Sequence, residues 1–139
     1  VRVREQEYGN FDSPEIEAQH QEKKVFGPFY YRFPNGESQA DCYDRAAAFL
    51  DTIEMAWKTD SWNDVQNCII VGHGVMNLII LARLLEMTIK QFQELDSLSN
   101  CEMVVLERKD ASEPFRVAFT WRQDQEKFAG GLRTKALPG

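Results

Sequence analysis

The stretch Cys68-Ile69-Ile70-Val71-Gly72-His73-Gly74-Val75 is an apolar run that stops at a histidine between two glycines. The residues that follow, 76–87, are rich in Leu, Ile, Ala and Met. This pattern predicts a buried strand over residues 68–71 and a helix over residues 76–87. His73 and Gly74 would then lie between the carboxyl end of a strand and a helix N-terminus, where open α/β sheets bind anions.

His73 has two interpretations at this point. It can be a buried histidine at a strand end, hydrogen-bonded to the backbone, with the glycines serving a tight turn. It can also be a phosphate ligand, an imidazolium beside the amides of a helix start. A helix dipole contributes only about 0.3–1 kcal/mol, so the imidazolium would supply most of the attraction. The neighbouring residues leave both interpretations open.

The composition limits which kinds of protein could carry such a site. A length of 139 residues predicts one compact domain. The net charge of −6 and the isoelectric point near 4.9 disfavour a broad surface for nucleic acid. A small phosphorylated partner is compatible with this charge, because its pocket needs only a few local cations and amides. An oligomeric state is compatible with this net charge as well.

The three cysteines, Cys42, Cys68 and Cys101, are far apart and show no C-x-x-C spacing. Their number and spacing argue against a disulfide framework and against a zinc site. We therefore expect a reducing, cytoplasmic setting. No apolar run approaches the ~20 residues that a membrane helix requires, and the start of the chain does not resemble a signal peptide. We expect no membrane partner.

The rest of the chain alternates predicted helices and strands. An aromatic loop, residues 29–33, is expected to form a cap over a pocket, and residues 109–114 have the length and composition of a hairpin connection. The predicted elements are helices over residues 12–24, 38–58 and 88–95 and strands over residues 102–108 and 115–121.

These elements predict an α/β domain over residues 1–122, followed by a polar, weakly ordered tail over residues 123–139. A fully apolar strand such as residues 68–71 normally has parallel neighbours on both sides. Few other segments of this chain could supply them. The predicted sheet is therefore incomplete.

Glu5 is a second candidate for chemistry. It lies in a charged stretch, residues 4–11, that also contains a glycine and two aromatic residues. The stretch can be a solvated turn, or Glu5 can be a general acid, which requires its pKa to rise from about 4.3 toward 6 or 7. We interpret Glu37 as an acid in the first turn of a helix and His20, on a polar helix, as an ordinary surface residue.

Four segments in this order carry a resemblance. They are residues 3–11 with Glu5, residues 31–38 with Asp41, Tyr43, Asp44 and Arg45 downstream, residues 71–74 with His73, and residues 100–102. Together they resemble the histidine phosphatase superfamily, and within it the phosphoglycerate mutase-like phosphatases of plants and fungi. The resemblance covers residues 3–108.

The resemblance implies a doubly wound, three-layer α/β fold with a mostly parallel sheet, of which this chain is the C-terminal portion. It implies phosphoryl transfer through a phosphohistidine, with Glu5 as the acid and base and His73 as the second histidine that donates to the phosphoryl oxygens. It implies no metal and no other cofactor. The substrate-binding residues that it suggests are Gly74, Asn100 and Cys101 together with the cations Arg4 and Arg32.

The chain also departs from this family. It contains no Arg-His-Gly motif, which holds the nucleophilic histidine, and His20 lies on the wrong side of the Glu5 segment to replace it. The family's second arginine is absent too. After the second histidine many members have a threonine and an arginine, where this chain has Met76-Asn77-Leu78.

Three explanations follow from these matches and departures. The chain can be part of a longer phosphomonoesterase or mutase, inactive by itself without the nucleophile, and we favour hydrolysis over mutase action. It can be a catalytically inactive relative that serves as a phosphate-binding or interaction module. It can also be an unrelated α/β domain with a structural His73. The substrate class, whether sugar phosphate, nucleotide or phosphopeptide, is left open by the sequence.

Overall fold

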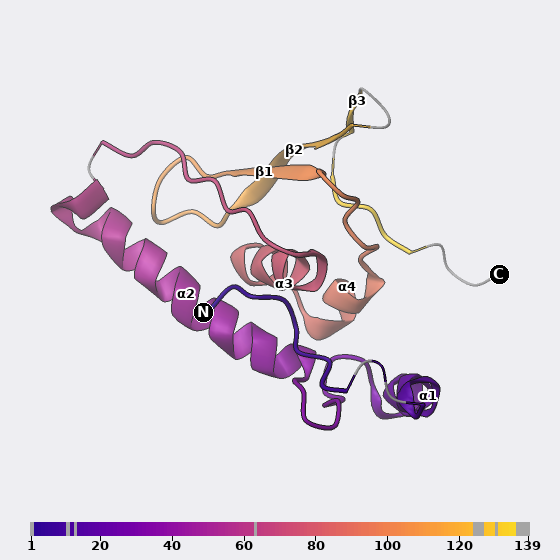
Figure 1. Cartoon of the computed structure of the whole chain (residues 1–139). Helices are drawn as coiled ribbons and strands as arrows, with labels where there is room; N and C mark the ends of the chain where they lie inside the picture. Colours follow the sequence, from indigo (N-terminus) through magenta and orange to yellow (C-terminus); the bar gives the residue numbers. More distant parts are fainter. Residues whose placement is uncertain are drawn as a thin grey trace. The chain divides into compact units, whose positions relative to one another are not determined.

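The computed structural model describes residues 2–10, 12, 14–62, 64–123, 127–129 and 131–135. The chain divides into two compact units, Val1–Ile80 and Leu81–Gly139, and the boundary between them falls inside helix α3, Gly74–Leu84 (Figure 1). No helix in the described ranges has both the length and the apolar character needed to cross a bilayer.

The first unit is built on α2, Gln39–Lys58, with α1, Ile16–Phe26, and the short 3-10 helix Asp60–Trp62. Ser38 caps α2 in a capping box: its Oγ accepts from Asp41 N at 3.1 Å, and Asp41 Oδ2 accepts from Ser38 N at 2.8 Å. The prediction that a long helix begins at Ser38 is confirmed.

The aromatic loop over residues 29–33 packs into the first unit. Phe29, Tyr31 and Phe33 are buried, whereas Tyr30 and Arg32 between them are exposed. Phe33 has no exposed surface, and its ring meets the edges of neighbouring aromatic rings, including Tyr31 at 5.3 Å. Alternate side chains of this loop therefore belong to the core, and the expected cap over a pocket stays a prediction for the exposed side chains.

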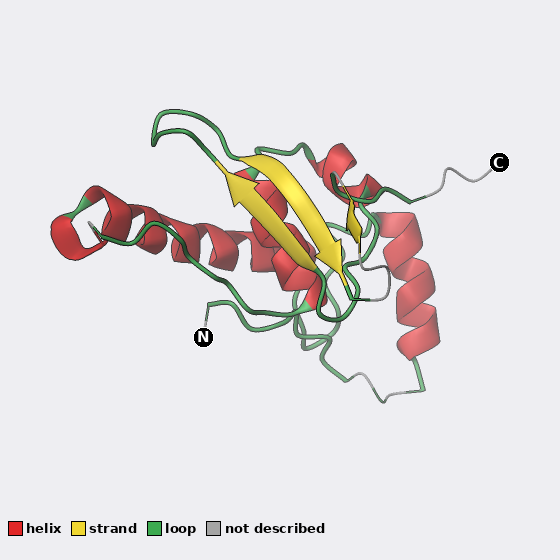
Figure 2. Cartoon of the chain, turned by 90° about the horizontal axis from the view of Figure 1, so that it is seen from above, coloured by secondary structure: helices red, strands yellow, loops and turns green. Residues whose placement is uncertain are grey.

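The second unit contains α4, Ile89–Glu94, and a sheet of the strands β1, Met103–Glu107, β2, Arg116–Arg122, and β3, Lys127–Ala129. The strand order is β1-β2-β3 and both pairs are antiparallel. Figure 2 shows β1 and β2 running side by side in opposite directions. The predicted hairpin is confirmed, because both strands and their turn are local in sequence.

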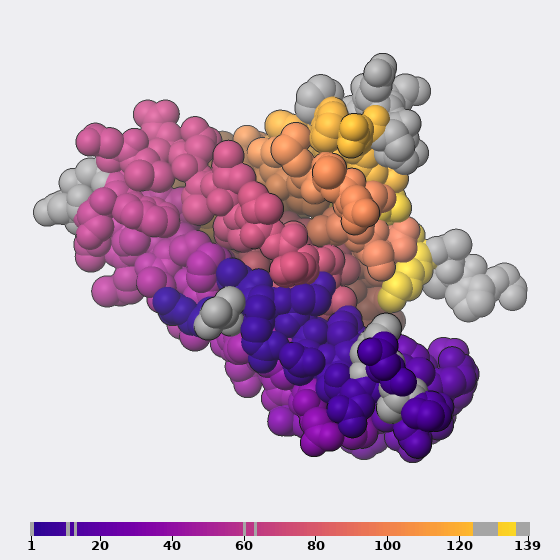
Figure 3. Space-filling view, viewed as in Figure 1, coloured from indigo at the N-terminus to yellow at the C-terminus, as the bar shows by residue number. Residues whose placement is uncertain are grey.

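The apolar segment that precedes His73 differs from its predicted structure. Residues 65–73 adopt no regular secondary structure, and Ile69 and Val71 are each 88% exposed. In Figure 3 the pink atoms of this part of the chain belong to the visible surface. The strand expected over residues 68–71 is not formed, because a strand requires a paired backbone and no described segment pairs with this one.

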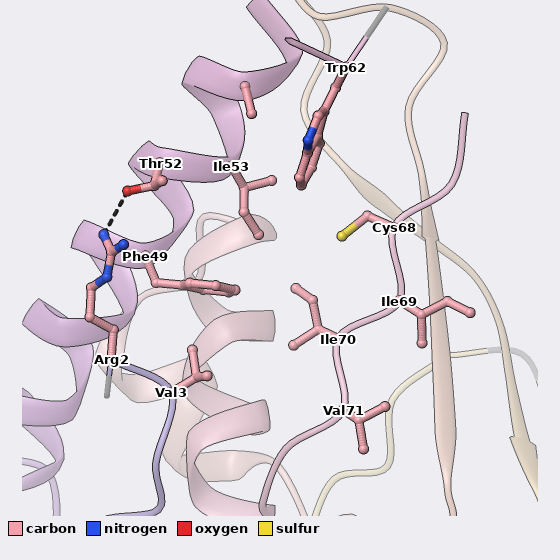
Figure 4. A pocket seen from close by; sticks show the side chains of 11 residues that line it. Arg2, Val3, Phe49, Thr52, Ile53, Trp62, Cys68, Ile69, Ile70 and Val71 are labelled. Atoms are coloured by element: carbon pink, nitrogen blue, oxygen red, sulfur yellow. Dashed lines mark hydrogen bonds between the residues drawn. The ribbon is translucent and has the colours of Figure 1, made fainter. Parts of the chain in front are cut away.

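A groove of about 400 Å³ separates this segment from α2. Figure 4 shows Phe49 and Ile53 of α2 pointing toward Cys68 and Ile70, while Ile69 points away. Side chains that alternate between two sides are the signature of an extended chain with a period of two. The segment is thus extended and apolar on both sides, as a central strand would be.

The chain after Gln123 contains more structure than the expected weakly ordered tail. β3 pairs with β2 through Thr120↔Ala129 and Arg122↔Lys127. Thr134 forms an isolated bridge with Leu95. Residues 136–139 lie outside the described part of the chain.

Candidate functional site

The carboxylate of Glu5 lies at the N-terminus of α3. Its Oε2 accepts a hydrogen bond from Val75 N at 3.1 Å, and its Oε1 accepts one from Met76 N at 3.0 Å. The first N–H groups of a helix have no acceptor within the helix and carry partial positive charge, so a carboxylate is favourable there. The fold thereby brings together Glu5 and Val75, which are 70 positions apart.

His73 immediately precedes α3, and its carbonyl oxygen accepts from Asn77 N at 2.8 Å. The residue is exposed, and within the described ranges its imidazole takes part in no hydrogen bond or ion pair. The interpretation of His73 as a buried histidine is therefore wrong. Its ring is accessible to a ligand next to the helix start that Glu5 caps.

The glycines on either side of His73 differ in the room that a side chain would have at each position. A Cβ on Gly72 would lie 2.5 Å from Asn77 Oδ1, so the Asn77 side chain occupies the space that Gly72 leaves. A Cβ on Gly74 would meet Glu5 Oε2 at 4.0 Å, which is an ordinary contact. Gly74 thus lies beside the Glu5 carboxylate, and Asn77 packs against the other glycine.

The segment that carries Glu5 is held by a bidentate ion pair between Glu37 and Arg45. Arg45 Nε donates to Glu37 Oε1 at 2.9 Å, and Arg45 Nη2 donates to Glu37 Oε2 at 3.0 Å. Arg45 Nη1 also donates to the carbonyl oxygens of Arg2, at 2.7 Å, and Arg4, at 3.3 Å. We call Glu37 and Arg45 the clamp. It fixes the backbone immediately before Glu5.

The clamp and its neighbours also fix the backbone after Glu5. Glu37 Oε2 accepts from Glu7 N at 3.0 Å, and Glu37 N donates to Glu7 O at 2.7 Å. Gln6 is buried, and its Nε2 donates to Glu37 O at 2.8 Å. Glu37 precedes the N-cap of α2, so it is a clamp residue rather than the first-turn acid expected from the sequence.

Two glycines let these backbones approach each other. A Cβ on Gly9 would collide with the Pro34 carbonyl oxygen, and a Cβ on Gly36 would lie 2.5 Å from Glu7 O. Gly9 also has φ +64°, in the left-handed region that favours glycine. The Glu5 segment therefore depends on glycine at both positions.

Burial alone would raise the pKa of Glu37, but hydrogen bonds from Arg45 and from the Glu7 N–H, together with the charges of Arg45 and Arg4, hold that pKa below its usual value. Burial, and then the Glu37 charge, raise the pKa of the Cys42 thiol to about 11. Burial, followed by the negative charge of Glu5, raises the pKa of Tyr8. The clamp is thus ionised at neutral pH, whereas Cys42 is a protonated thiol.

The two cations predicted to bind substrate already have carboxylate partners. Arg4 Nη2 lies 3.0 Å from Glu37 Oε1, and Arg32 Nη2 lies 2.6 Å from Asp41 Oδ1. Arg32 is exposed, with 65% of its side chain accessible. The structure therefore joins Arg4 to the clamp, and it gives Arg32 a place at the start of α2.

Asn100 and Cys101 belong to the second unit, and the structure places them in a turn of that unit. Glu102 N donates to Ser99 O at 3.1 Å, which closes a four-residue turn. Cys101 has φ +59°, a left-handed conformation that is uncommon for a residue with a Cβ. Both residues are exposed.

Sequence reasoning assigned no role to Arg45, Gln6 or Asn77. The spacing offers one signal in retrospect: Arg45 follows Glu37 by eight positions, about two helical turns. That spacing does not identify the carbonyl acceptors of Arg45, which lie more than 40 positions away. The described residues include no group of three or more His, Cys, Asp or Glu that could hold a metal ion.

Comparison with known proteins identifies relatives of this chain. The family model of the histidine phosphatase superfamily, branch 1, matches residues 1–119. Phosphoglycerate mutase-like protein AT74H of Arabidopsis thaliana is 37% identical over 76% of this chain and 40% of its own length. Phosphoglycerate mutase-like protein AT74 of the same plant is 35% identical, over 76% of this chain and 35% of its own length.

A fungal protein extends this set of relatives. Broad-range acid phosphatase DET1 of Saccharomyces cerevisiae is 30% identical, over 76% of this chain and 32% of its own length. The chain thus spans about a third to two-fifths of the length of these relatives. The family model covers both the Glu5 segment and the His73 segment. The chain belongs to the histidine phosphatase superfamily, an α/β family.

Proposed function

We propose that the full-length protein is a phosphomonoesterase that works through a phosphohistidine intermediate, with Glu5 and His73 in its active site. The observation that carries this proposal is that the Glu5 carboxylate binds the first N–H groups of α3 and that the exposed His73 immediately precedes the same helix. The superfamily match and the relative named as a broad-range acid phosphatase support a phosphatase-like activity.

In this mechanism the nucleophilic histidine comes from a segment outside the present residues, since the chain has no Arg-His-Gly. The nucleophile forms a bond to phosphorus as the bond to the leaving oxygen breaks, and Glu5 gives that oxygen a proton. Water then attacks the phosphorus atom, the bond from phosphorus to the histidine nitrogen breaks, and the Glu5 carboxylate takes a proton from the water. His73 donates an N–H to the phosphoryl oxygens, where negative charge develops.

The helix start holds the Glu5 carboxylate in a fixed position. Val75 N and Met76 N each use one lone pair of a different carboxylate oxygen, so each oxygen keeps a second lone pair that can exchange a proton. Two fixed hydrogen bonds limit how the carboxylate rotates. Positioning of this kind is a large part of what an active site supplies.

The remaining expectations belong to the same proposal. Gly74, the turn with Asn100 and Cys101, and the cations Arg4 and Arg32 would bind the substrate, a small phosphorylated molecule rather than nucleic acid. We favour hydrolysis over mutase action and a cytoplasmic location. The full fold would be the doubly wound, three-layer sheet, in which residues 68–71 form a central strand paired with segments from the rest of the protein.

The first experiment compares His73→Ala with His20→Ala in the full-length protein, with p-nitrophenyl phosphate as the substrate. We expect His73→Ala to lower kcat/KM by about 10²-fold or more and His20→Ala to change it by less than about twofold. His73 is exposed, so a thermal melt should show both variants folded. Unchanged turnover in His73→Ala would remove this residue from the mechanism.

A second experiment separates the role of Glu5. Glu5→Gln keeps the shape of the side chain but cannot donate a proton. We expect a larger loss of kcat with an alkyl phosphate, whose leaving group needs protonation, than with p-nitrophenyl phosphate. Equal losses with the two esters would contradict a role for Glu5 as the acid.

An inactive phosphate-binding module is the second candidate function. Two observations favour it: Met76-Asn77-Leu78 replaces the expected residues, and both candidate cations are paired with carboxylates. Equilibrium binding of inorganic phosphate by a full-length protein that hydrolyses neither ester would establish this function. Turnover that depends on His73 would exclude it.

A further inference from the structure

The C-terminal segment over residues 131–135, which we call the strap, is bound to the loop that follows α4. Asp96 N donates to Arg133 O at 2.9 Å, and Lys135 N donates to Glu94 O at 2.8 Å. Thr134 forms an antiparallel bridge with Leu95. The strap therefore runs beside residues 94–96 and carries the Arg133 side chain along the same loop.

Arg133 joins the two ends of the loop over residues 96–102. Its Nη1 lies 3.2 Å from Asp96 Oδ2, at one end, and its Nη2 lies 2.7 Å from Glu102 Oε2, at the other. The Glu102 side chain is only 3% exposed. A carboxylate so nearly buried needs a charged partner, because an unpaired charge in such a place is strongly destabilising. Arg133 supplies that partner.

The same two side chains hold the turn inside the loop. Glu102 Oε2 accepts from Ser99 N at 2.7 Å, and Arg133 Nη2 lies within hydrogen-bond distance of Ser99 Oγ, at 3.2 Å, and of Ser97 O, at 2.7 Å. The turn places Cys101 in a left-handed conformation that costs a residue with a Cβ free energy, so it needs support from its surroundings. Arg133 and Glu102 provide this support.

We propose that Arg133 is a positioning residue: it holds the turn from Ser99 to Glu102, and with it the backbone of Asn100 and Cys101, in the conformation that binds a phosphoryl group. Arg133 itself does not touch the substrate. This inference rests on the proposed function for the place of the turn in the site. Arg133 lies beyond residues 1–119, which the family model matches, so this support is not part of the family match.

The test uses Arg133→Met, Arg133→Lys and the control Lys135→Met in the full-length protein. Lys135 is a strap residue, and its Nζ donates to the carbonyl oxygen of Gln93, not to the loop over residues 96–102. Steady-state kinetics with p-nitrophenyl phosphate separate KM from kcat. Hydrogen exchange of the peptide that covers residues 96–102 reports the order of the loop independently of activity.

We expect Arg133→Met to raise KM about tenfold, as when an amide hydrogen bond to an anion is weakened, with kcat changed less than about threefold. Exchange in residues 96–102 should accelerate. Arg133→Lys should raise KM less than Arg133→Met does, because an ammonium can neutralise Glu102 but cannot span both ends of the loop. Lys135→Met should match the wild type in both measurements.

Three results would overturn the proposal: unchanged exchange in Arg133→Met, a fall in kcat with KM unchanged, or the same KM effect in Lys135→Met. If the wild-type protein has no turnover, the proposed function fails, and titration with inorganic phosphate replaces the kinetics. Weaker phosphate binding by Arg133→Met together with faster exchange then supports the positioning role. Equal binding, or no binding by the wild type, overturns it.

Discussion

Two segments of the first unit that lie outside its helices contain or precede the two candidate catalytic residues, and they are held in opposite ways. The segment with Glu5, residues 2–9, has its carbonyl and N–H groups bound by Arg45 and Glu37. The segment before His73, residues 65–73, has no strand partner in the described ranges, and Ile69 is 88% exposed. The first segment has hydrogen-bond partners for these backbone groups within the chain. The second shows an apolar surface that nothing described covers.

The two segments differ because their interactions need different numbers of partners. A bidentate guanidinium–carboxylate pair needs only two side chains, so the clamp forms within residues 2–45. A buried strand needs backbone partners on both sides and apolar layers on both faces. Burying one Val or Ile side chain contributes about 1.5–3 kcal/mol, so the exposed segment is a template for pairing with another strand.

The largest effect is expected when a charge is placed in the apolar segment, residues 65–73. In the full-length protein we expect Val71→Lys to lower the free energy of unfolding by about 4 kcal/mol, because a covered strand would bury the charge. Val25→Lys, on α1, is the matched control: Val25 is 91% exposed and Val71 is 88% exposed. We expect the control to change stability by less than about 0.5 kcal/mol. Denaturant unfolding measures both, and equal small effects would show that residues 65–73 stay uncovered.

The next largest effect is expected when a side chain is added to the segment that carries Glu5, residues 2–9. Gly9→Ala places a Cβ against the Pro34 carbonyl oxygen at a positive φ, and we expect a loss of about 3 kcal/mol in the free energy of unfolding. Gly27→Ala separates strain from collision, because Gly27 also has a positive φ, +112°, but a Cβ there meets nothing within 4 Å. The control should lose about 1–2 kcal/mol. If chemical denaturation gives the same loss for both, the close approach of the two backbones is not what holds Glu5.

The clamp predicts a pH dependence of stability. The pKa of Glu37 is lowered in the folded state from its usual value of 4.5, so its contribution is complete above pH 4.5 and disappears as the pH falls through the lower, folded-state pKa. We expect Glu37→Gln to cost about 2 kcal/mol at pH 7. The difference from the wild type should shrink below about pH 4.5, as measured by denaturant unfolding at several pH values.

The control for this prediction is Glu54→Gln. Glu54 pairs with Lys58 at 3.4 Å on the exposed side of α2, and an (i, i+4) pair of this kind contributes about 0.2–0.5 kcal/mol. A loss in Glu37→Gln that persists unchanged into acid would contradict the ionic clamp.

The smallest effect concerns the helix that carries the clamp. Ser38→Ala removes a buried N-cap at the start of α2, and we expect a loss of about 1 kcal/mol. Thr88→Ala removes the corresponding cap of α4, which is exposed, and should lose about 0.5 kcal/mol. Thermal unfolding of the two variants checks the order. A larger loss of stability in Thr88→Ala would show that burial of the N-cap side chain does not increase its contribution to stability.

The elements that sequence predicted well are local ones. The capping boxes that begin at Ser38 and Thr88 involve residues three positions apart, and the β1–β2 hairpin joins neighbouring segments. Their signals lie within a short window, so pattern and propensity suffice. The resemblance also selected Glu5 and His73 together, but composition and spacing alone left each of them with an ordinary alternative.

The polar contacts that hold the site could not be predicted in this way. Arg45 reaches carbonyl oxygens of Arg2 and Arg4, and Arg133 reaches Asp96 and Glu102, at separations of 31 positions or more. A guanidinium can find a carboxylate or a carbonyl almost anywhere, so only the folded backbone shows which acceptors lie within reach. The close approach of Gly9 and Pro34 could not be predicted either, because it too depends on the folded backbone.

The helices with their caps, the hairpin and the family could be predicted without the structure, because they depend on local hydrogen bonds and on motifs in a fixed order. The folded structure was needed to show that Glu5 caps the helix after His73, that Glu37 belongs to the clamp and that residues 65–73 have no strand partner in the described part of the chain. The physical reason is common to all three. Each depends on whether a distant backbone or charged group is present to complete a hydrogen-bonding partnership.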